Sequence, residues 1–329
     1  MPRAAILSVG AFAPEKVVPN SYFNELYGED VDNWLRQNVE IYERRWCSDS
    51  ESTAFLAEKA ARQALERAGI EAADLDLIII ATDTPEFISP STAAVVQYRL
   101  GAKNAGTFDL NTACAGFVTA LDTGAKYIAA DANYRHVLVV GAYAMSKFLN
   151  LADKKTATLF ADGAGAVVLA KKENENGGFL ASQLISKGEY YDWMGIYAGG
   201  AHEPTTAEVL DRHDHQLKFV KKFPKELNPD MWTGMIGNLC QRIQIQPSDV
   251  DHFFITQINI NSIRETMNRL NLPSEKAHTV MHRYGYTGSA CIPMALNDAH
   301  EKGKLKKGDL VFFLGSGGGL AFASAAFRW

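Results

Sequence analysis

The chain has 329 residues, of which 47% are hydrophobic and 22% charged, and its formal net charge is −5; this is typical of a globular protein with a substantial core. The mild acidity and the lack of a long Lys/Arg run argue against a nucleic-acid surface or a polybasic membrane anchor, and no apolar run reaches the roughly 18 residues of a spanning helix. The N-terminus lacks the features of a signal peptide and the 4 cysteines form no CxxC motif, so we expect a reduced, cytoplasmic protein.

Helical and strand patterns alternate through the first half of the chain. A strand at Ala4–Val9 is followed by an amphipathic helix at Ser52–Ala68 and a fully apolar strand at Leu75–Thr82. Another helix begins at Pro90, and a third buried strand covers Val137–Gly141. Continuous apolar strands that alternate with helices are typical of an α/β fold whose sheet is covered on both faces.

The second half repeats this order at a nearly constant offset. The apolar strand that follows Asp76 recurs after Asp251, an offset of 175, and the VLVVG strand at Val137 recurs as VFFLG at Val311, an offset of 174. Two halves of one topology are therefore predicted. By the same spacing, the loops Thr256–Asn259 and Gly285–Ala290 are expected to meet the equivalent loops of the first half at one central site.

We place the boundary between the halves at residue 172, which gives an N-terminal half at 1–172 and a C-terminal half at 173–329. The stretch 173–235 fits the repeat poorly and is interpreted as an insertion in the second half. It contains His202, His213 and His215, but the absence of a well-spaced fourth ligand favours a solvated loop over a metal site.

Cys114 lies where a buried strand ending at Leu110 meets a helix predicted over Ala115–Ile128. Unpaired N–H groups and partial positive charge at a helix N-terminus lower the pKa of a nearby thiol, so we expect a nucleophilic thiolate near neutral pH. Ala113 and Gly116 leave room for a substrate. The position alone fits a buried structural cysteine equally well, so other motifs must decide.

Three motifs carry a family resemblance: TACAGF around Cys114, FADGAGAVVL from Phe160 and GSGGGLAFASAAF from Gly315. Together they resemble the thiolase superfamily, and specifically the β-ketoacyl-[acyl carrier protein] synthase III group. The resemblance implies a thiolase-like five-layered αβαβα fold built from two similar halves. It also implies an acyltransferase of lipid metabolism in which Cys114 attacks an acyl thioester of coenzyme A or acyl carrier protein, with no separate cofactor or metal.

The resemblance assigns further residues by their positions in the motifs. Gly319 matches the glycine whose N–H completes the oxyanion hole with that of the nucleophile. Trp34 matches a tryptophan that stacks on the adenine of coenzyme A, although a partly buried structural role is an alternative. Phe160 matches a phenylalanine that lines the acyl pocket, although ordinary core packing is an alternative.

The loop TPEFISPST also has a counterpart in the family, where it crosses the dimer to line the acyl pocket of the partner. Phe87 is therefore a candidate pocket residue. Glu86 is a candidate base acting in the other subunit, with an exposed loop carboxylate as the alternative. Cys240 and Cys291 have no signature that favours a thiolate and are predicted to lie in the core.

The sequence departs from the family at the two positions that stabilise the enolate of malonyl thioester. Thr256 stands where the family has histidine in an HQAN-type motif, and Tyr286 stands where it has asparagine in a GNTS-type motif. Asn259 is retained and is predicted to bind substrate. A threonine offers one weak neutral donor and a tyrosine donates from the end of a much longer ring, which argues against ordinary malonyl-dependent condensation.

Three hypotheses remain open at this point. Acyl-Cys114 could pass its acyl group to an alcohol, an amine or an unusual carbon nucleophile, or it could take part in condensation with rearranged donors that include Tyr286 and His282. The third hypothesis is a non-catalytic subunit that binds an acyl chain or carrier protein in a heterodimer. The retained TACAG and GSGGG motifs favour an enzyme, and the resemblance implies a homodimer.

Overall fold

Two mixed sheets form the frame of the protein. The computed structural model describes residues 3–172 and 177–329. The first sheet has the strand order β1 (Arg3–Phe12), β7 (Asp162–Lys172), β6 (His136–Ala144), β4 (Leu77–Ala81) and β5 (Gly106–Leu110). The second has the order β11 (His252–Ile255), β12 (Leu310–Gly317), β13 (Ala321–Arg328) and β8 (Gly178–Ser186).

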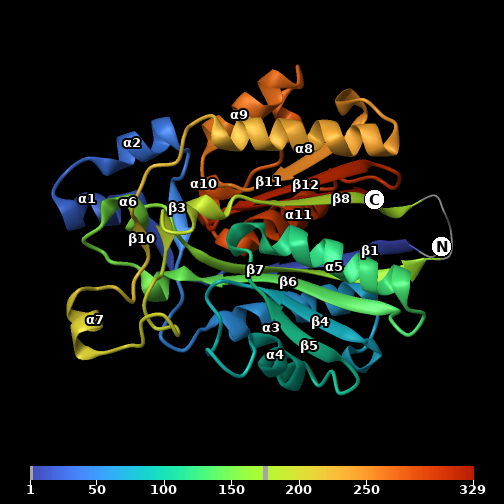
Figure 1. Cartoon of the computed structure of the whole chain (residues 1–329), viewed down its shortest axis with the longest axis horizontal. Coiled ribbons are helices and arrows are strands. Elements are labelled where there is room, and N and C mark those ends of the chain that lie inside the picture. The colour runs from blue at the N-terminus through green and yellow to red at the C-terminus, as the bar shows by residue number, and fades with distance from the viewer. Residues whose placement is uncertain (1–2, 173–176) are drawn as a thin grey trace.

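Helices fill three further layers, so the five-layered αβαβα arrangement predicted above is confirmed (Figure 1). The central layer consists of α5 (Gly116–Ala130) and α11 (Cys291–Glu301), which lie between the sheets. The outer layers are α3 (Thr53–Ala68) with α4 (Thr92–Leu100), and α8 (Leu227–Ile243) with α9 (Ile260–Arg269). The first nine residues of α11 are all buried, as expected for a helix between two sheets.

Strand β4 illustrates why the central strands are apolar throughout. Ile79 packs into the core around α5, whereas Ile78 and Ile80 pack into the separate core under α3. Successive side chains of a strand point to opposite faces, and helices cover both faces here, so the alternation of apolar and polar residues is lost.

Small residues let α3 lie directly on the first sheet. The helix is capped by the Ser52 side chain, which accepts from the Phe55 N–H, and it ends at Gly69 with a positive φ of 67°. A Cβ atom built on Gly10 of β1 would lie 2.5 Å from the carbonyl oxygen of Ala60. Only glycine fits at this contact between the helix and the strand.

The repeat extends to details of local structure. The 3₁₀ turns Ala72–Asp74 and Pro247–Asp249 precede β4 and β11, and each carries a reciprocal capping box. The 3₁₀ turns Ala113–Ala115 and Gly288–Ala290 precede the central helices α5 and α11. Both pairs of turns are separated by 175 residues, the offset predicted from the apolar strands.

Strand β8 corrects the predicted extent of the insertion. Its residues lie within the stretch 173–235, yet β8 pairs antiparallel with β13 just as β1 pairs with β7. The strand therefore belongs to the repeated sheet, and α8 begins the outer helical layer at Leu227. β8 is an edge strand that is only partly buried and carries the polar residues Ser182 and Gln183 at its centre, so it does not resemble the fully apolar strands on which the repeat was recognised.

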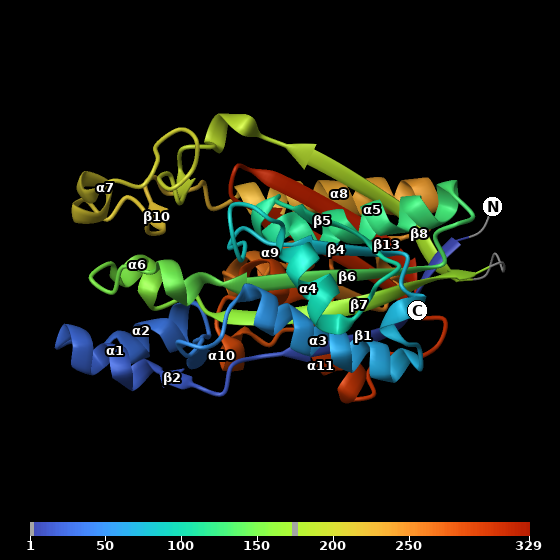
Figure 2. The same cartoon turned by 90° about the horizontal axis from the view of Figure 1, so that it is seen from below.

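Short elements gather at one end of the layers, where Figures 1 and 2 place α1, α2, α6, α7 and β10. They are β2 (Val17–Pro19), α1 (Asn20–Tyr27), α2 (Val31–Asn38), β3 (Glu43–Arg45), α6 (Lys154–Ala157), β9 (Met194–Gly195), α7 (Ala207–Asp211), β10 (Lys218–Phe219) and α10 (Met281–Tyr284). Within residues 3–172 and 177–329, every helix is too short or too polar to cross a membrane.

Candidate active site

Cys114 sits in a strained turn between β5 and α5. The preceding residue, Ala113, has a φ of +46°, which is uncommon for a residue with a side chain. The side-chain oxygen of Asn111 accepts from the Ala113 N–H at 3.0 Å and so helps to hold this conformation. Backbone strain of this kind persists only where the surroundings enforce it, and it is concentrated at functional sites.

The glycine-rich end of β12 lies against this turn. A Cβ atom on Gly317 would come within 2.6 Å of the Cys114 backbone nitrogen, and one on Gly315 within 2.7 Å of the Ala115 Cα. Both positions therefore require glycine for steric reasons. Gly319 differs, because its surroundings are open and its φ of +127° is what favours glycine there.

The Cys114 side chain is buried, with 2% of its surface exposed. Burial is the main cause that raises the pKa of Cys114 well above its usual value, and the charge of Asp83 raises it further. Hydrogen bonds from Tyr286 and from the backbone act in the opposite direction. The expectation of a resting thiolate is thus wrong: desolvation outweighs the helix N-terminus, and the free enzyme holds a neutral thiol.

Tyr286 brings the second half of the chain to Cys114. Its backbone N–H donates to the carbonyl oxygen of Leu159 at 2.8 Å, and its carbonyl accepts from the Ala161 N–H at 2.9 Å, which forms a bridge beside Phe160. The Phe160 and Tyr286 rings are edge to face with centroids 5.2 Å apart. Burial and the nearby Cys114 raise the pKa of Tyr286 well above its usual value, so its hydroxyl remains a donor.

The sequence analysis missed two polar residues of this site, Asp83 and Tyr143. Each lies two residues beyond paired positions of β4 and β6, since Ala81 pairs with Gly141. Burial, followed by the charges of Asp83 and Cys114, raises the pKa of Tyr143 well above its usual value. The rule that parallel strands present their carboxyl ends at one edge could have identified both residues from the predicted strands.

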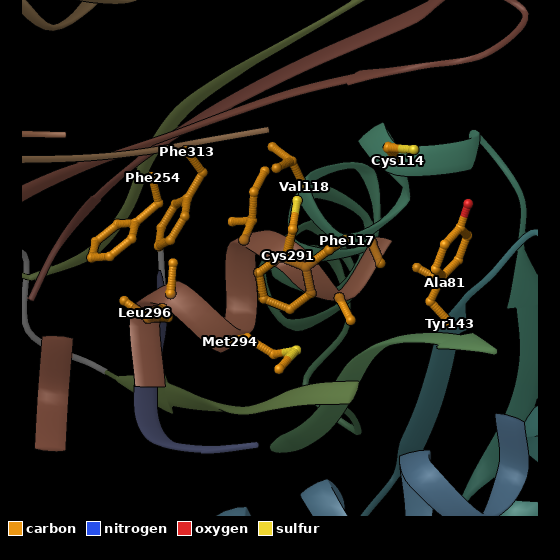
Figure 3. Packing of buried hydrophobic residues seen from close by; sticks show 14 of the residues in the cluster. Ala81, Cys114, Phe117, Val118, Tyr143, Phe254, Cys291, Met294, Leu296 and Phe313 are labelled. Carbon is orange, nitrogen blue, oxygen red and sulfur yellow. The ribbon is translucent and has the colours of Figure 1, made fainter. Parts of the chain in front are cut away.

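Figure 3 shows the Tyr143 hydroxyl directed toward the turn that carries Cys114, with Cys291 at the start of α11 in the same core. Cys291 is buried, and burial raises its pKa to about 12. Burial also raises the pKa of Cys240 to about 11. Both cysteines lie in the core, as predicted.

Comparison with known proteins decides the family. The family description 3-oxoacyl-[acyl-carrier-protein] synthase III matches residues 108–188, and the description of its C-terminal part matches residues 240–329. A β-ketoacyl-[acyl-carrier-protein] synthase III from Clostridioides difficile is 37% identical over 99% of this chain and 98% of its own. The chain belongs to the 3-oxoacyl-[acyl-carrier-protein] synthase III family.

Other members of this synthase III family are similar to the chain along its whole length. A relative from Halalkalibacterium halodurans is 37% identical over 100% of this chain and 99% of its own. The crystal structure of 3-oxoacyl-[acyl-carrier-protein] synthase III from Aquifex aeolicus superposes with a TM-score of 0.89 at 30% identity, covering 99% of this chain and 100% of that one. The predicted thiolase-like fold and membership in a family of acyltransferases are confirmed.

Two residues predicted from the synthase III motifs, Thr256 and Asn259, form hydrogen bonds that hold the local fold. Thr256 is fully buried; its hydroxyl accepts from the Ser316 N–H at 2.9 Å and directs its one proton at the Ser316 carbonyl, 3.4 Å away. It therefore ties the end of β11 to β12. Asn259 caps α9, because its side chain accepts from the Asn261 N–H at 3.0 Å.

His282 and Trp34 lie on the peripheral elements. His282 is on α10, where its ring contacts Tyr42 with a centroid distance of 6.2 Å, and burial followed by Arg283 and Lys302 lowers its pKa. The groups that shift the pKa of Cys114 come from other elements. Trp34 is on α2 with 55% of its surface exposed, so its ring is open to a ligand rather than part of a core.

The two candidate residues of the loop after β4, Glu86 and Phe87, have different surroundings. Phe87 has 52% of its surface exposed. Glu86 instead turns back onto its own chain, where its carboxylate accepts from the Ser52 hydroxyl at 2.9 Å and from the Ala54 N–H at 2.8 Å. Both earlier interpretations of Glu86 are thereby corrected: it binds the N-terminus of α3, where the helix dipole favours an anion.

Among the described residues there is no cluster of three or more His, Cys, Asp or Glu side chains that could hold a metal ion. The His213 and His215 rings lie 6.3 Å apart in a polar loop that also contains the ion pairs of Arg212 with Glu203 and Asp214. The residues of the Cys114 site are suited to nucleophilic acyl transfer instead.

Proposed function

We propose that this synthase III family member loads an acyl group from a coenzyme A or acyl-carrier-protein thioester onto Cys114 and passes it to a second substrate. The observation that carries the proposal is the strained turn that presents the Cys114 sulfur between β5 and α5, with the glycine-rich end of β12 packed against its backbone. The substrate thioester is the only group that the chemistry requires, with no metal and no further cofactor.

Loading is an exchange of one thioester for another. The Cys114 sulfur gives up its proton and attacks the carbonyl carbon, the bond from that carbon to the donor sulfur breaks, and the departing thiolate takes up the proton. Charge develops on the carbonyl oxygen during the attack. The backbone N–H groups of Cys114 and Gly319 are the proposed donors to this oxygen, and loss of one such donor typically costs about 2.7 to 4 kcal/mol of barrier.

The surroundings of Cys114 favour direct transfer over decarboxylative condensation. Condensation needs two donors aimed at the enolate oxygen of a malonyl thioester. The hydroxyl proton of Thr256 is directed at Ser316, and the hydroxyl of Tyr286 hydrogen-bonds Cys114 itself. An acceptor that carries its own nucleophilic oxygen or nitrogen needs no enolate, so the site fits an alcohol or amine acceptor better.

Exposed apolar residues beside an open sheet edge support a homodimer. β5 is the last strand of the first sheet, and one of its edges has no partner strand within the described residues. Ile88 is 86% exposed and Tyr98 is 84% exposed on the segments that lead to β5. An unpaired edge flanked by large exposed apolar side chains is a surface that a second subunit would cover.

We propose the cytoplasm as the location of this dimer.

Intact-protein mass spectrometry tests the proposal directly. The wild type and Cys114→Ala are mixed with acyl-coenzyme A and acyl-carrier-protein thioesters of increasing chain length, and the loaded protein is then treated with malonyl thioester. We expect an added acyl mass in the wild type alone, stable toward malonyl thioester. Discharge with formation of a ketoacyl product would establish condensation, and complete absence of acyl mass would refute the acyl-Cys114 intermediate.

A further inference from the structure

Asp83 follows β4, the strand that lies between β5, which leads to Cys114, and β6, which carries Tyr143. Its two neighbours are tied to these strands: the Thr82 N–H donates to Leu110 at 3.1 Å, and the Thr84 hydroxyl accepts from the Ala144 N–H at 2.9 Å. Asp83 is therefore held between the turn of Cys114 and the strand that carries Tyr143.

The Asp83 carboxylate has an unused oxygen. Its Oδ1 atom is shielded from solvent and has no hydrogen-bond partner within residues 3–172 and 177–329, although the residue as a whole keeps some exposed surface. A buried carboxylate oxygen without a donor is costly, and such a group is expected only where it serves a purpose. Burial raises the pKa of Asp83 to about 6, which allows the carboxylate to exchange protons near neutral pH.

Other carboxylates nearby are fully used in holding the fold. Asp109 accepts from the Thr92 and Ala93 N–H groups at the start of α4. Asp162 accepts from the backbone N–H groups of Cys47 and Ser146 and from the Ser146 hydroxyl. The free oxygen of Asp83 thus sets it apart from these structural carboxylates.

We infer that Asp83 is the general base of the second half-reaction, acting on an acceptor that carries an O–H or N–H group. This inference rests on the acyl-Cys114 intermediate proposed above. The acceptor oxygen or nitrogen bonds to the acyl carbon while Asp83 takes its proton, and the bond from that carbon to the Cys114 sulfur breaks. The proton then passes from Asp83 to the departing thiolate, which restores the carboxylate and the thiol.

Replacing Asp83 by asparagine should have different effects on the loading of Cys114 and on its discharge. The groups that interact with its charge are Cys114 from the turn before α5 and Tyr143 from β6. Because the negative charge of Asp83 raises the pKa of Cys114, Asp83→Asn should favour the thiolate and load as fast as the wild type or faster. Discharge should slow by about 100-fold or more, the usual range for loss of a general base.

The experiment measures both steps separately. The wild type, Asp83→Asn and the matched control Glu86→Gln are loaded with an acyl-coenzyme A that labels the wild type, desalted, and followed by intact mass between pH 5 and 8 in water and in water with 1-butanol. Glu86→Gln removes a carboxylate of the same loop that binds the start of α3 and pairs with Arg99 of α4. We expect the wild type and Glu86→Gln to discharge faster as pH rises through about 6, and Asp83→Asn to lack this rise.

Each other result overturns the assignment in a recognisable way. Discharge of Asp83→Asn at the wild-type rate, or a wild type without the rise near pH 6, would show that Asp83 is not the base. Equal slowing of loading and discharge in Asp83→Asn would indicate a purely structural role. If the wild type takes up no acyl mass at all, the proposed function itself fails and the assignment falls with it.

Discussion

Tyr286→Phe tests whether the residue at the family asparagine position now supports the nucleophile. The Tyr286 hydroxyl hydrogen-bonds Cys114 and lowers the pKa of the thiol, whereas the ring packs edge to face on Phe160 and would remain in place. A hydrogen bond to a charged group contributes about 1.5 to 3 kcal/mol, and one pKa unit corresponds to about 1.36 kcal/mol. Removing the hydroxyl should therefore raise the pKa of Cys114 by about 1 to 2 units.

The assay is alkylation of Cys114 by iodoacetamide at a fixed pH near 8, followed by intact mass. Below the pKa of the thiol, the thiolate fraction falls tenfold for each unit by which the pKa rises, so the alkylation rate should drop by about 10- to 100-fold. Tyr143→Phe is the matched control. Tyr143 interacts with Cys114 only through charge, and its hydroxyl is neutral at this pH, so its removal should leave the alkylation rate of Cys114 unchanged. Equal rates for Tyr286→Phe and the wild type would contradict the role given to Tyr286.

Three further changes test other parts of the structure. Gly317→Ala places a Cβ 2.6 Å from the Cys114 nitrogen and should abolish acyl loading in the mass assay; loading at the wild-type level would contradict the close packing. Trp34→Ala should raise the KM for acyl-coenzyme A about tenfold, since stacking on a base is worth about 1 to 3 kcal/mol, and should leave the KM for acyl-pantetheine unchanged. Burial tends to raise the pKa of Asp298, but hydrogen bonds from His278 and Lys302 outweigh it and hold that pKa well below its usual range. Asp298→Asn should thus cost about 2 kcal/mol of unfolding free energy at pH 7, and the difference should shrink as pH falls below about 4, measured by urea unfolding.

The amino-acid sequence by itself determined the fold and singled out Cys114 as the candidate nucleophile. The apolar strands that follow Asp76 and Asp251 recur at the offset that also separates the two 3₁₀ turns before the central helices. Such regularities are local, because burial on both faces of a sheet dictates the composition of each strand separately. The motif around Cys114 is also contiguous, so its resemblance to the family could be recognised without a structure.

Only the tertiary structure decided what surrounds Cys114 and in which state the thiol rests. Asp83, Tyr286 and Cys291 reach it from separate segments, and the pKa of the thiol follows from its burial together with their charges and hydrogen bonds. The role of Glu86 could not be predicted from the sequence either, because the residues next to it in the chain give no sign that it binds the start of α3. A pKa and a hydrogen bond depend on distances of a few ångströms between residues far apart in the chain, and only the packing of the two sheets sets those distances.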